Sequence, residues 1–296
     1  MLERFTEPEY RHPLEANALL VRVTQGCTWN RCNYCYVSRG YKFSYVTYEE
    51  MEEQLRAKEG RYPATTKVWM VGSNPLVLPT ERLLKYIGQI RSHFPRFSEI
   101  AMQARVTDVR RKSMEEIREL RAAGINELFL GVESGDEEIL KMLNKGATAQ
   151  TALEQMQRLN EADMGIVPMY MIGGGGAGTW ERNARKTAEL LSQVRSRMIS
   201  TTGLTVFKGT PLWDMRAAGA FREAPEAEKV REMLEFIRNL KAETLLYCNH
   251  YLNPVHFTAQ LPRDKDKICA GLERFLEENT AEEIEDMVGR QFKSSL

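Results

Sequence analysis

A regular alternation of strand-like and helix-like stretches, from about residue 18 to residue 207, most constrains the fold. Short apolar runs predict six strands, at residues 19–23, 67–71, 99–104, 127–132, 166–172 and 198–207. Helical patterns lie between them, at residues 47–59, 79–93, 113–123, 136–144 with 149–162, and 179–194. Strands that are each followed by a helix predict parallel pairing through right-handed crossovers. The chain is therefore predicted to be α/β, either a full or partial (β/α) barrel or an open doubly wound sheet.

Local signals support two of the helix starts. Thr47 with Glu50, and Ser113 with Glu116, have the spacing of a capping box. Gly124 lies between the helix predicted at residues 113–123 and the fourth predicted strand, and a glycine at that position commonly ends a helix. In either architecture ligands bind at the carboxyl ends of the strands, so those ends are where we expect functional residues.

After Pro211 the alternation stops. Residues 223–243 are charged and helical, residues 245–253 form a short apolar stretch with polar residues, and residues 263–290 are helical again. We therefore predict two parts: a barrel core over residues 1–212 and a mostly helical C-terminal extension over residues 213–296, packed on the barrel.

The overall composition narrows the class of protein. The 296 residues are 43% hydrophobic and 28% charged, as in ordinary globular proteins. The 41 lysines and arginines balance 41 aspartates and glutamates, so no global basic field attracts nucleic acid or a membrane surface. The N-terminus lacks an apolar signal core, and no run of about 18 apolar residues occurs. We expect a cytoplasmic protein with no membrane partner.

Three of the five cysteines, Cys27, Cys32 and Cys35, lie within nine residues, directly after the first predicted strand. This clustering is too tight for a disulfide framework and favours metal binding in a reducing compartment. Three thiolates can hold three irons of a cubane iron–sulfur cluster. The fourth iron then has no protein ligand and can bind a substrate or cofactor.

Three interpretations of this loop compete. Structural zinc needs four ligands, but the nearest histidine is His12, and Cys248 and Cys269 are more than 200 residues away. A cluster that only transfers electrons usually has four cysteines in a small protein. The third interpretation, a catalytic cluster at the mouth of an α/β barrel, needs only the three cysteines present, and we favour it.

The loop resembles the cluster loop of radical S-adenosylmethionine enzymes. That family usually has three residues in the first gap and two in the second, the last of them aromatic. This chain has four residues in the first gap, then Asn33 and Tyr34. It resembles a Cys-x4-Cys-x2-Cys variant found in a branch similar in its core to the tRNA methylthiotransferases, the Elongator catalytic subunit and the anaerobic coproporphyrinogen oxidases. The resemblance extends over roughly residues 15–265, and it implies a partial (β/α)6 TIM-like barrel.

The resemblance also implies a site. Cys27, Cys32 and Cys35 would bind a [4Fe–4S] cluster and serve as the catalytic cysteines. The residues that it implies for binding S-adenosylmethionine are Tyr34 by the adenine, Gly72, Ser73, Asn74 and Pro75 at the amino group, Arg105 in the same pocket, Glu133 at the ribose and Lys145 at the methionine carboxylate. From the residues alone, Glu133 could equally be a solvated strand-end acid, and Lys145 an ordinary cation at a helix C-terminus.

The function that the resemblance implies is an oxygen-sensitive enzyme that cleaves S-adenosylmethionine reductively and abstracts a hydrogen atom from an unidentified substrate. The alternative class is a non-enzymatic iron–sulfur protein that transfers electrons or binds a partner. His250 and Asn253 are candidate substrate-facing residues, although His250 also suits a packing role. The balanced charge favours a small-molecule or cofactor-like substrate over nucleic acid. The resemblance further implies an electron donor such as flavodoxin or ferredoxin.

Overall fold

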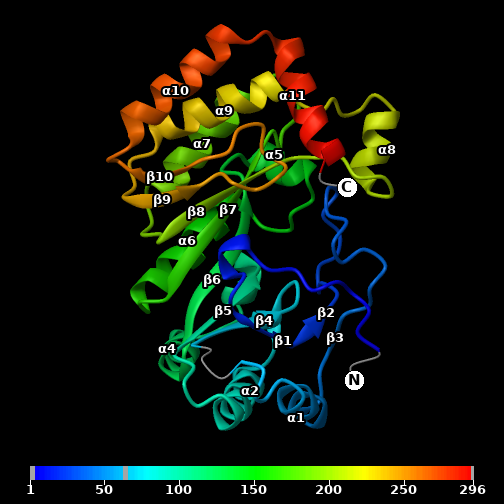
Figure 1. Ribbon diagram of the computed structural model, residues 1–296, viewed down its shortest axis with the longest axis vertical. Helices are drawn as coiled ribbons and strands as arrows, with labels where there is room; N and C mark the ends of the chain where they lie inside the picture. The colour runs from blue at the N-terminus through cyan, green and yellow to red at the C-terminus, as the bar shows by residue number, and fades with distance from the viewer. Residues whose placement is uncertain (1–3, 63–65, 295–296) are drawn as a thin grey trace. The chain divides into compact units, whose positions relative to one another are not determined.

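The structure, a computed structural model, describes residues 4–62 and 66–294 (Figure 1). An eight-stranded sheet has the order β1-β4-β5-β6-β7-β8-β9-β10, and β2 with β3 forms a two-stranded sheet. The strands are β1 (Leu19–Arg22), β2 (Thr24–Gln25), β3 (Ser44–Tyr45), β4 (Lys67–Val71), β5 (Glu99–Ala104), β6 (Ile125–Glu133), β7 (Gly165–Ile172), β8 (Met198–Gly203), β9 (Thr244–Tyr247) and β10 (Thr258–Leu261). The pairs β1–β4, β4–β5, β5–β6, β7–β8 and β8–β9 are parallel. This confirms the predicted α/β class with a mostly parallel sheet, the arrangement of a partial TIM-like barrel.

The helices fall close to the predicted ranges. They are α1 (Tyr48–Arg56), α2 (Thr80–His93), α3 (Val106–Val109), α4 (Met114–Ala123), α5 (Glu137–Met142), α6 (Ala149–Glu161), α7 (Trp180–Leu191), α8 (Pro211–Ala217), α9 (Glu226–Asn239), α10 (Lys265–Glu278) and α11 (Ala281–Ser294), with short 3-10 turns η1 (Pro13–Glu15) and η2 (Pro75–Val77). No helix of the described ranges is both long and apolar enough to cross a bilayer.

The chain forms two compact units that alternate along the sequence. Unit 1 comprises the residues up to Asn30, Val37–Gly131 and Glu154–Ile166. Unit 2 comprises Arg31–Tyr36, Val132–Leu153 and the residues from Val167 onward. The predicted division of the chain at residue 212 stays a prediction.

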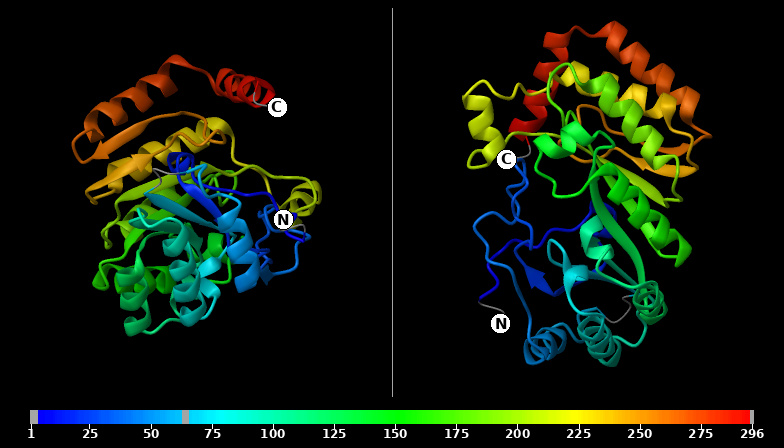
Figure 2. Two further views of the ribbon diagram at one scale, coloured as in Figure 1. Left: turned by 60° about the horizontal axis from the view of Figure 1, so that its bottom comes forward. Right: turned by 180° about the vertical axis from the view of Figure 1, so that it is seen from behind.

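In unit 1 the strands are buried almost throughout. Val68, Trp69 and Met70 in β4 have no exposed surface, as expected for a parallel strand covered on both faces. Helices α1, α2 and α4 lie side by side against this unit's strands (Figures 1 and 2). Both predicted capping boxes are present, at the starts of α1 and α4. The unit's core thus follows directly from the apolar runs and the helix signals.

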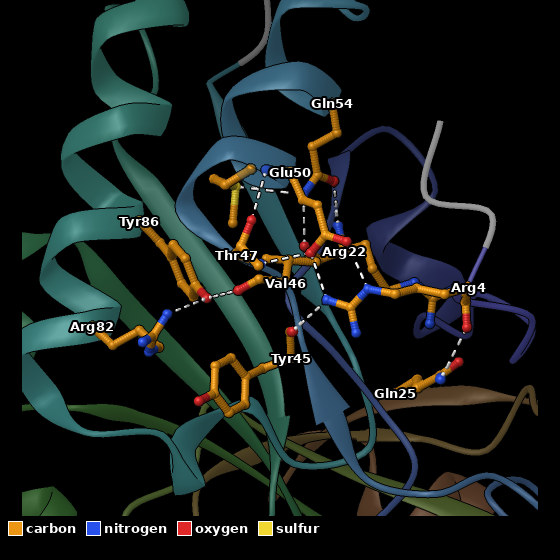
Figure 3. A network of polar contacts seen from close by, with 11 residues as sticks. Arg4, Arg22, Gln25, Tyr45, Val46, Thr47, Glu50, Gln54, Arg82 and Tyr86 are labelled. Atoms are coloured by element: carbon orange, nitrogen blue, oxygen red, sulfur yellow. Dashed lines mark hydrogen bonds and ion pairs between the residues drawn. The ribbon is translucent and has the colours of Figure 1, made fainter.

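Side chains from α1 also cover the edge of the sheet at β1. Gln54 Oε1 accepts the backbone N–H of Arg22 at 2.9 Å, and Gln54 Nε2 donates to the Arg22 carbonyl at 2.8 Å (Figure 3). One amide side chain therefore pairs the backbone N–H and carbonyl of Arg22 at this edge, as a neighbouring strand would. At the other end of α1, Arg4 Nε donates to Glu50 at 2.6 Å. This network fixes the N-terminal segment and α1 to β1.

In unit 2, α7 packs against α9, and α10 and α11 pack on α9 (Figure 1). Two features differ from the sequence expectation. The stretch at 245–253 contributes β9, which pairs with β8, and β10 runs antiparallel to β9. The single helical stretch expected over 263–290 is two helices, α10 and α11. The C-terminal part of the chain is therefore mostly helical, but it also extends the sheet.

Candidate functional site

The five cysteines all lie in the described part of the chain, and none of them is in a disulfide there. Cys27, Cys32 and Cys35 are partly exposed, so they are accessible to a metal cluster. The N–H of Cys35 donates to the carbonyl of Cys32 at 3.3 Å, which makes a short turn. No three or more Cys, His, Asp or Glu side chains of residues 4–62 and 66–294 gather around a single metal ion. In a cubane each cysteine binds a different iron, so this finding concerns single-ion sites.

Asn33 anchors the turn that carries Cys32 and Cys35, within unit 2. Its side-chain nitrogen donates to the Met142 carbonyl at 2.6 Å, and its backbone N–H donates to the Leu143 carbonyl at 2.8 Å. These carbonyls end α5 and have no partner inside the helix. The Leu212 N–H, in the first turn of α8, donates to the Asn33 carbonyl at 2.9 Å. Two helix ends therefore hold the turn through groups that need a partner.

Glu133, Lys145 and Tyr34 meet in unit 2. Lys145 Nζ lies 2.6 Å from Glu133 Oε1 and 3.3 Å from the Tyr34 hydroxyl. Glu133 and Lys145 are only 6% and 7% exposed. Glu133 is therefore not a solvated acid, and Lys145 is a buried ion-pair partner rather than a surface cation. All three residues were predicted to bind the cofactor, and the structure brings them together.

The backbone of Glu133 is strained. Its φ is +70°, in the left-handed region that non-glycine residues seldom adopt. Burial, followed by the negative charge of Glu133, raises the pKa of Tyr34 well above its ordinary value, so the phenol stays protonated. Backbone strain such as that of Glu133 persists only where surrounding contacts hold it, and it is common at ligand sites. Together with the buried ion pair, it marks the end of β6 as a candidate binding point.

The turn after β4, in unit 1, is built around Gly72. Its φ is +149°, and a Cβ there would lie 2.0 Å from Thr24 Oγ1, so only glycine fits. Ser73 follows, and Asn74 is fully buried. Asn74 Nδ2 donates to Thr28 Oγ1 at 2.7 Å, directly after Cys27. Pro75 then starts η2. The turn predicted to contact a cofactor therefore also supports the start of the cysteine loop.

Arg105 lies beside the same loop in unit 1. Its guanidinium carbon is 5.5 Å from the centroid of the Trp29 ring. The backbone N–H of Arg105 donates to Asp108 at 3.0 Å, and Asn74 Nδ2 lies 3.4 Å from the other oxygen of that carboxylate. Burial raises the pKa of Asp108. Sequence reasoning missed Trp29 and Asp108; the position of Trp29 inside the cysteine loop was the signal available.

The sequence model of the Radical SAM superfamily matches residues 21–181, more than half of the chain. The chain belongs to the radical SAM superfamily. The predicted recognition is confirmed, and with it the prediction of an enzyme at the level of the family. Membership implies a [4Fe–4S] cluster and S-adenosylmethionine as cofactors.

Curated relatives of this radical SAM chain include the following two proteins. It is 22% identical over 247 residues to the tRNA-2-methylthio-N(6)-dimethylallyladenosine synthase of Aquifex aeolicus, covering 79% of this chain and 54% of that protein. It is 26% identical over 216 residues to the mitochondrial radical S-adenosyl methionine domain-containing protein 1 of Bos taurus, covering 69% of this chain and 47% of the relative. The chain thus spans about half the length of these relatives.

Solved structures share the fold. Coproporphyrinogen III oxidase (HemN) of Escherichia coli matches with a TM-score of 0.59 at 15% identity, covering 80% of this chain and 60% of that one. Elp3 of Methanocaldococcus infernus matches with a TM-score of 0.55 at 14% identity, covering 88% and 63%. Methylornithine synthase (PylB) matches with a TM-score of 0.51 at 16% identity, covering 88% and 82%. At these identities the likeness concerns the fold alone, and it confirms the partial TIM-like barrel.

The residues of the radical SAM chain fit the implied cofactors chemically. Three accessible thiols in a short loop supply the soft sulfur donors that iron–sulfur clusters require. The glycine turn after β4 lets backbone approach a ligand where a side chain would collide.

The two candidate substrate residues, in unit 2, have packing contacts. Asn253 is fully buried, and its amide nitrogen donates to the carbonyls of Thr201 at 3.0 Å and Cys248 at 2.9 Å. His250 Nδ1 accepts the Leu252 N–H at 3.2 Å. Burial, with the neighbouring His256, lowers the pKa of His250 to about 4, so this imidazole is neutral at pH 7. Their role toward a substrate stays a prediction.

Proposed function

We propose that this chain cleaves S-adenosylmethionine reductively at a [4Fe–4S] cluster held by Cys27, Cys32 and Cys35, and removes a hydrogen atom from a substrate. The observation that carries the proposal is the three-cysteine loop, partly exposed and free of disulfides, inside the region that matches the superfamily. When bound, the two cofactors would supply the chemistry, which is the reductive cleavage of S-adenosylmethionine and the removal of the hydrogen atom.

The protein's own part is to bind and orient. Lys145 offers a buried positive charge suited to a carboxylate, and Glu133 offers acceptor oxygens suited to ribose hydroxyls. Tyr34 provides an aromatic face for the adenine. In unit 1, the backbone of Gly72, Ser73, Asn74 and Pro75 suits the amino group of the methionine, with Arg105 as a further polar contact. Selectivity then depends on placing one substrate carbon near the reactive one.

The substrate class is part of the proposal. The Aquifex aeolicus relative is named for a modified tRNA adenosine, but the two proteins are 22% identical and the chain spans about half of it. The equal numbers of acidic and basic residues favour a small-molecule or cofactor-like substrate over nucleic acid. We also propose a cytoplasmic location and an electron donor of the flavodoxin or ferredoxin kind.

Anaerobic reconstitution with iron and sulfide, followed by reduction in the presence of S-adenosylmethionine, tests the proposal. We expect 5′-deoxyadenosine from the wild type and from Cys269→Ala, which removes a partly exposed thiol outside the loop. We expect none from Cys32→Ala.

Other outcomes would contradict the proposal. A chain that holds the cluster but neither cleaves S-adenosylmethionine nor changes its electron paramagnetic resonance spectrum when it is added would favour the electron carrier. Tight binding of one zinc per chain, without iron, would exclude both the enzyme and the electron carrier.

A further inference from the structure

The N-terminal segment before β1 has no place in the function so far, yet it carries a buried acid. Glu7 is 4% exposed. Its Oε2 accepts the backbone N–H of Gly26 at 2.7 Å, and its Oε1 accepts the hydroxyl of Ser38 at 2.6 Å. Gly26 directly precedes Cys27, and Ser38 is the third residue after Cys35. One carboxylate therefore bonds both ends of the cysteine loop.

The geometry at Gly26 suits this contact. Its φ is +69°, and a Cβ there would lie within 2.9 Å of the backbone of Tyr41 and Lys42. Only glycine adopts this conformation without strain or collision. The hydrogen bonds to a carboxylate are the strong, charge-assisted kind.

The contact continues to the turn after β4. The Ser38 hydroxyl hydrogen-bonds the Ser73 hydroxyl, next to Gly72. Glu7, Gly72, Ser73 and Gln103 line one small hollow at the carboxyl ends of β4 and β5. All of these residues belong to unit 1.

Glu7 is itself held in place. Arg22 Nη2 donates to the Glu7 carbonyl at 2.7 Å, and Arg22 also lies 3.5 Å from Glu9. Because Arg22 is the last residue of β1, the sheet fixes the backbone that presents the carboxylate.

We propose that Glu7 is a positioning residue for the cluster loop. This inference rests on the proposed function. Its carboxylate holds the two ends of the loop together, so the loop is closed before the cluster binds. Closing a loop costs chain entropy, and a bond that closes it in advance removes that cost from cluster binding. Residues that orient metal ligands typically change metal affinity by about 10–100-fold when lost.

The test compares Glu7→Ala with the control Glu119→Ala, which removes an exposed carboxylate on α4 of the same unit, away from the loop. We expect both apoproteins to keep their circular dichroism spectrum. After reconstitution, Glu7→Ala should lose iron to a chelator at least about tenfold faster than the wild type, with an altered electron paramagnetic resonance spectrum of the reduced cluster. Glu119→Ala should match the wild type. Glu7→Gln should recover most of the retention, because its amide oxygen still accepts from Gly26.

The inference is overturned if Glu7→Ala holds iron as long as the wild type, with the same spectrum. If Glu7→Ala does not fold, Ser38→Ala replaces it, since it removes the Glu7 contact at the far end of the loop, together with the bond to Ser73, and leaves the contact at Gly26 in place. Wild-type retention in Ser38→Ala would then overturn the inference. A wild type that takes up no cluster would refute the proposed function as well. A wild type that cleaves S-adenosylmethionine while the Glu7 variants retain iron equally well refutes this inference alone.

Discussion

The buried ion pair of Glu133 and Lys145 has consequences for stability that do not depend on any cofactor. Removing one partner leaves the other charge buried, which typically costs about 3–5 kcal/mol. We expect Lys145→Met to lower the free energy of unfolding of the apoprotein by that order at pH 7. The double variant Glu133→Gln with Lys145→Met should recover much of the loss. Urea unfolding followed by circular dichroism measures both.

An exposed ion pair provides the control. Arg118 and Glu161 lie 3.0 Å apart with side chains 52% and 62% exposed. Pairs of this kind contribute about 1 kcal/mol or less, so Arg118→Met should change little. Equal losses of unfolding free energy from Lys145→Met and Arg118→Met would contradict the burial of an unpaired charge at Glu133.

Two glycines of unit 1 should respond in opposite directions to the same substitution. Gly72→Ala places a Cβ 2.0 Å from Thr24 Oγ1, at a φ of +149°. Overpacking of this kind costs about 1–3 kcal/mol. Gly88 is exposed inside α2 with nothing within 4 Å of a Cβ, so Gly88→Ala should stabilise by about 0.5–1 kcal/mol. Urea midpoints that shift in the same direction would contradict this account of Gly72.

At the scale of the element, α9 connects to the sheet through one buried acid. Glu232 accepts bonds from the Tyr170 hydroxyl at 2.6 Å, from Asn183 Nδ2 at 2.7 Å and from the Gly173 N–H at 3.1 Å. Burial raises the pKa of Glu232 to about 7, although these bonds and Lys229 act against the rise.

This raised pKa predicts a dependence of stability on pH. Between about pH 4.5 and pH 7 the folded chain keeps a proton at Glu232 that the unfolded chain has released. The free energy of unfolding should therefore fall as pH rises through this window, by at most about 3 kcal/mol, and level off above it. Glu232→Gln removes this contribution. Urea unfolding at pH 5 and pH 8 should show the advantage of wild type over variant shrinking at pH 8; a constant difference would refute the assignment.

The strands and helices show what local patterns can and cannot predict. The run predicted at residues 67–71 has the same bounds as β4, because both faces of that strand are apolar. Strand β9 was not predicted, because a strand of four residues followed by polar residues gives no clear pattern. Its pairing with β8 is also long-range. The break between α10 and α11 did have a signal: Thr280 and Glu283 form a capping box.

In the candidate site, too, some residues could be predicted from the sequence and others could not. Glu133 and Lys145 were predictable because Glu133 is the last residue of β6 and Lys145 lies just after α5, two places that the family resemblance marks. Glu7 was not, because its partners lie 19 and 31 residues away and a single acid before the first strand has no pattern. Contacts between side chains distant in sequence depend on packing, which local periodicity does not encode.

At the scale of the whole molecule, loading of the cysteine loop should be visible in the unfolding of the chain, because a ligand that binds only the folded state shifts its unfolding equilibrium. A ligand that binds only the folded state stabilises it by about 2.7 kcal/mol at a concentration 100 times its dissociation constant. If S-adenosylmethionine binds through the open iron, this stabilisation requires the cluster.

We therefore expect S-adenosylmethionine to raise the apparent melting temperature of the reconstituted chain by roughly 5 °C or more under anaerobic conditions, since 1 kcal/mol corresponds to about 2–4 °C at this size. The same addition to Cys32→Ala, treated identically, should raise it far less. Circular dichroism melting over a series of S-adenosylmethionine concentrations measures both. Equal rises would mean that the nucleoside is bound by protein groups alone, and that an iron without a protein ligand is not what holds it.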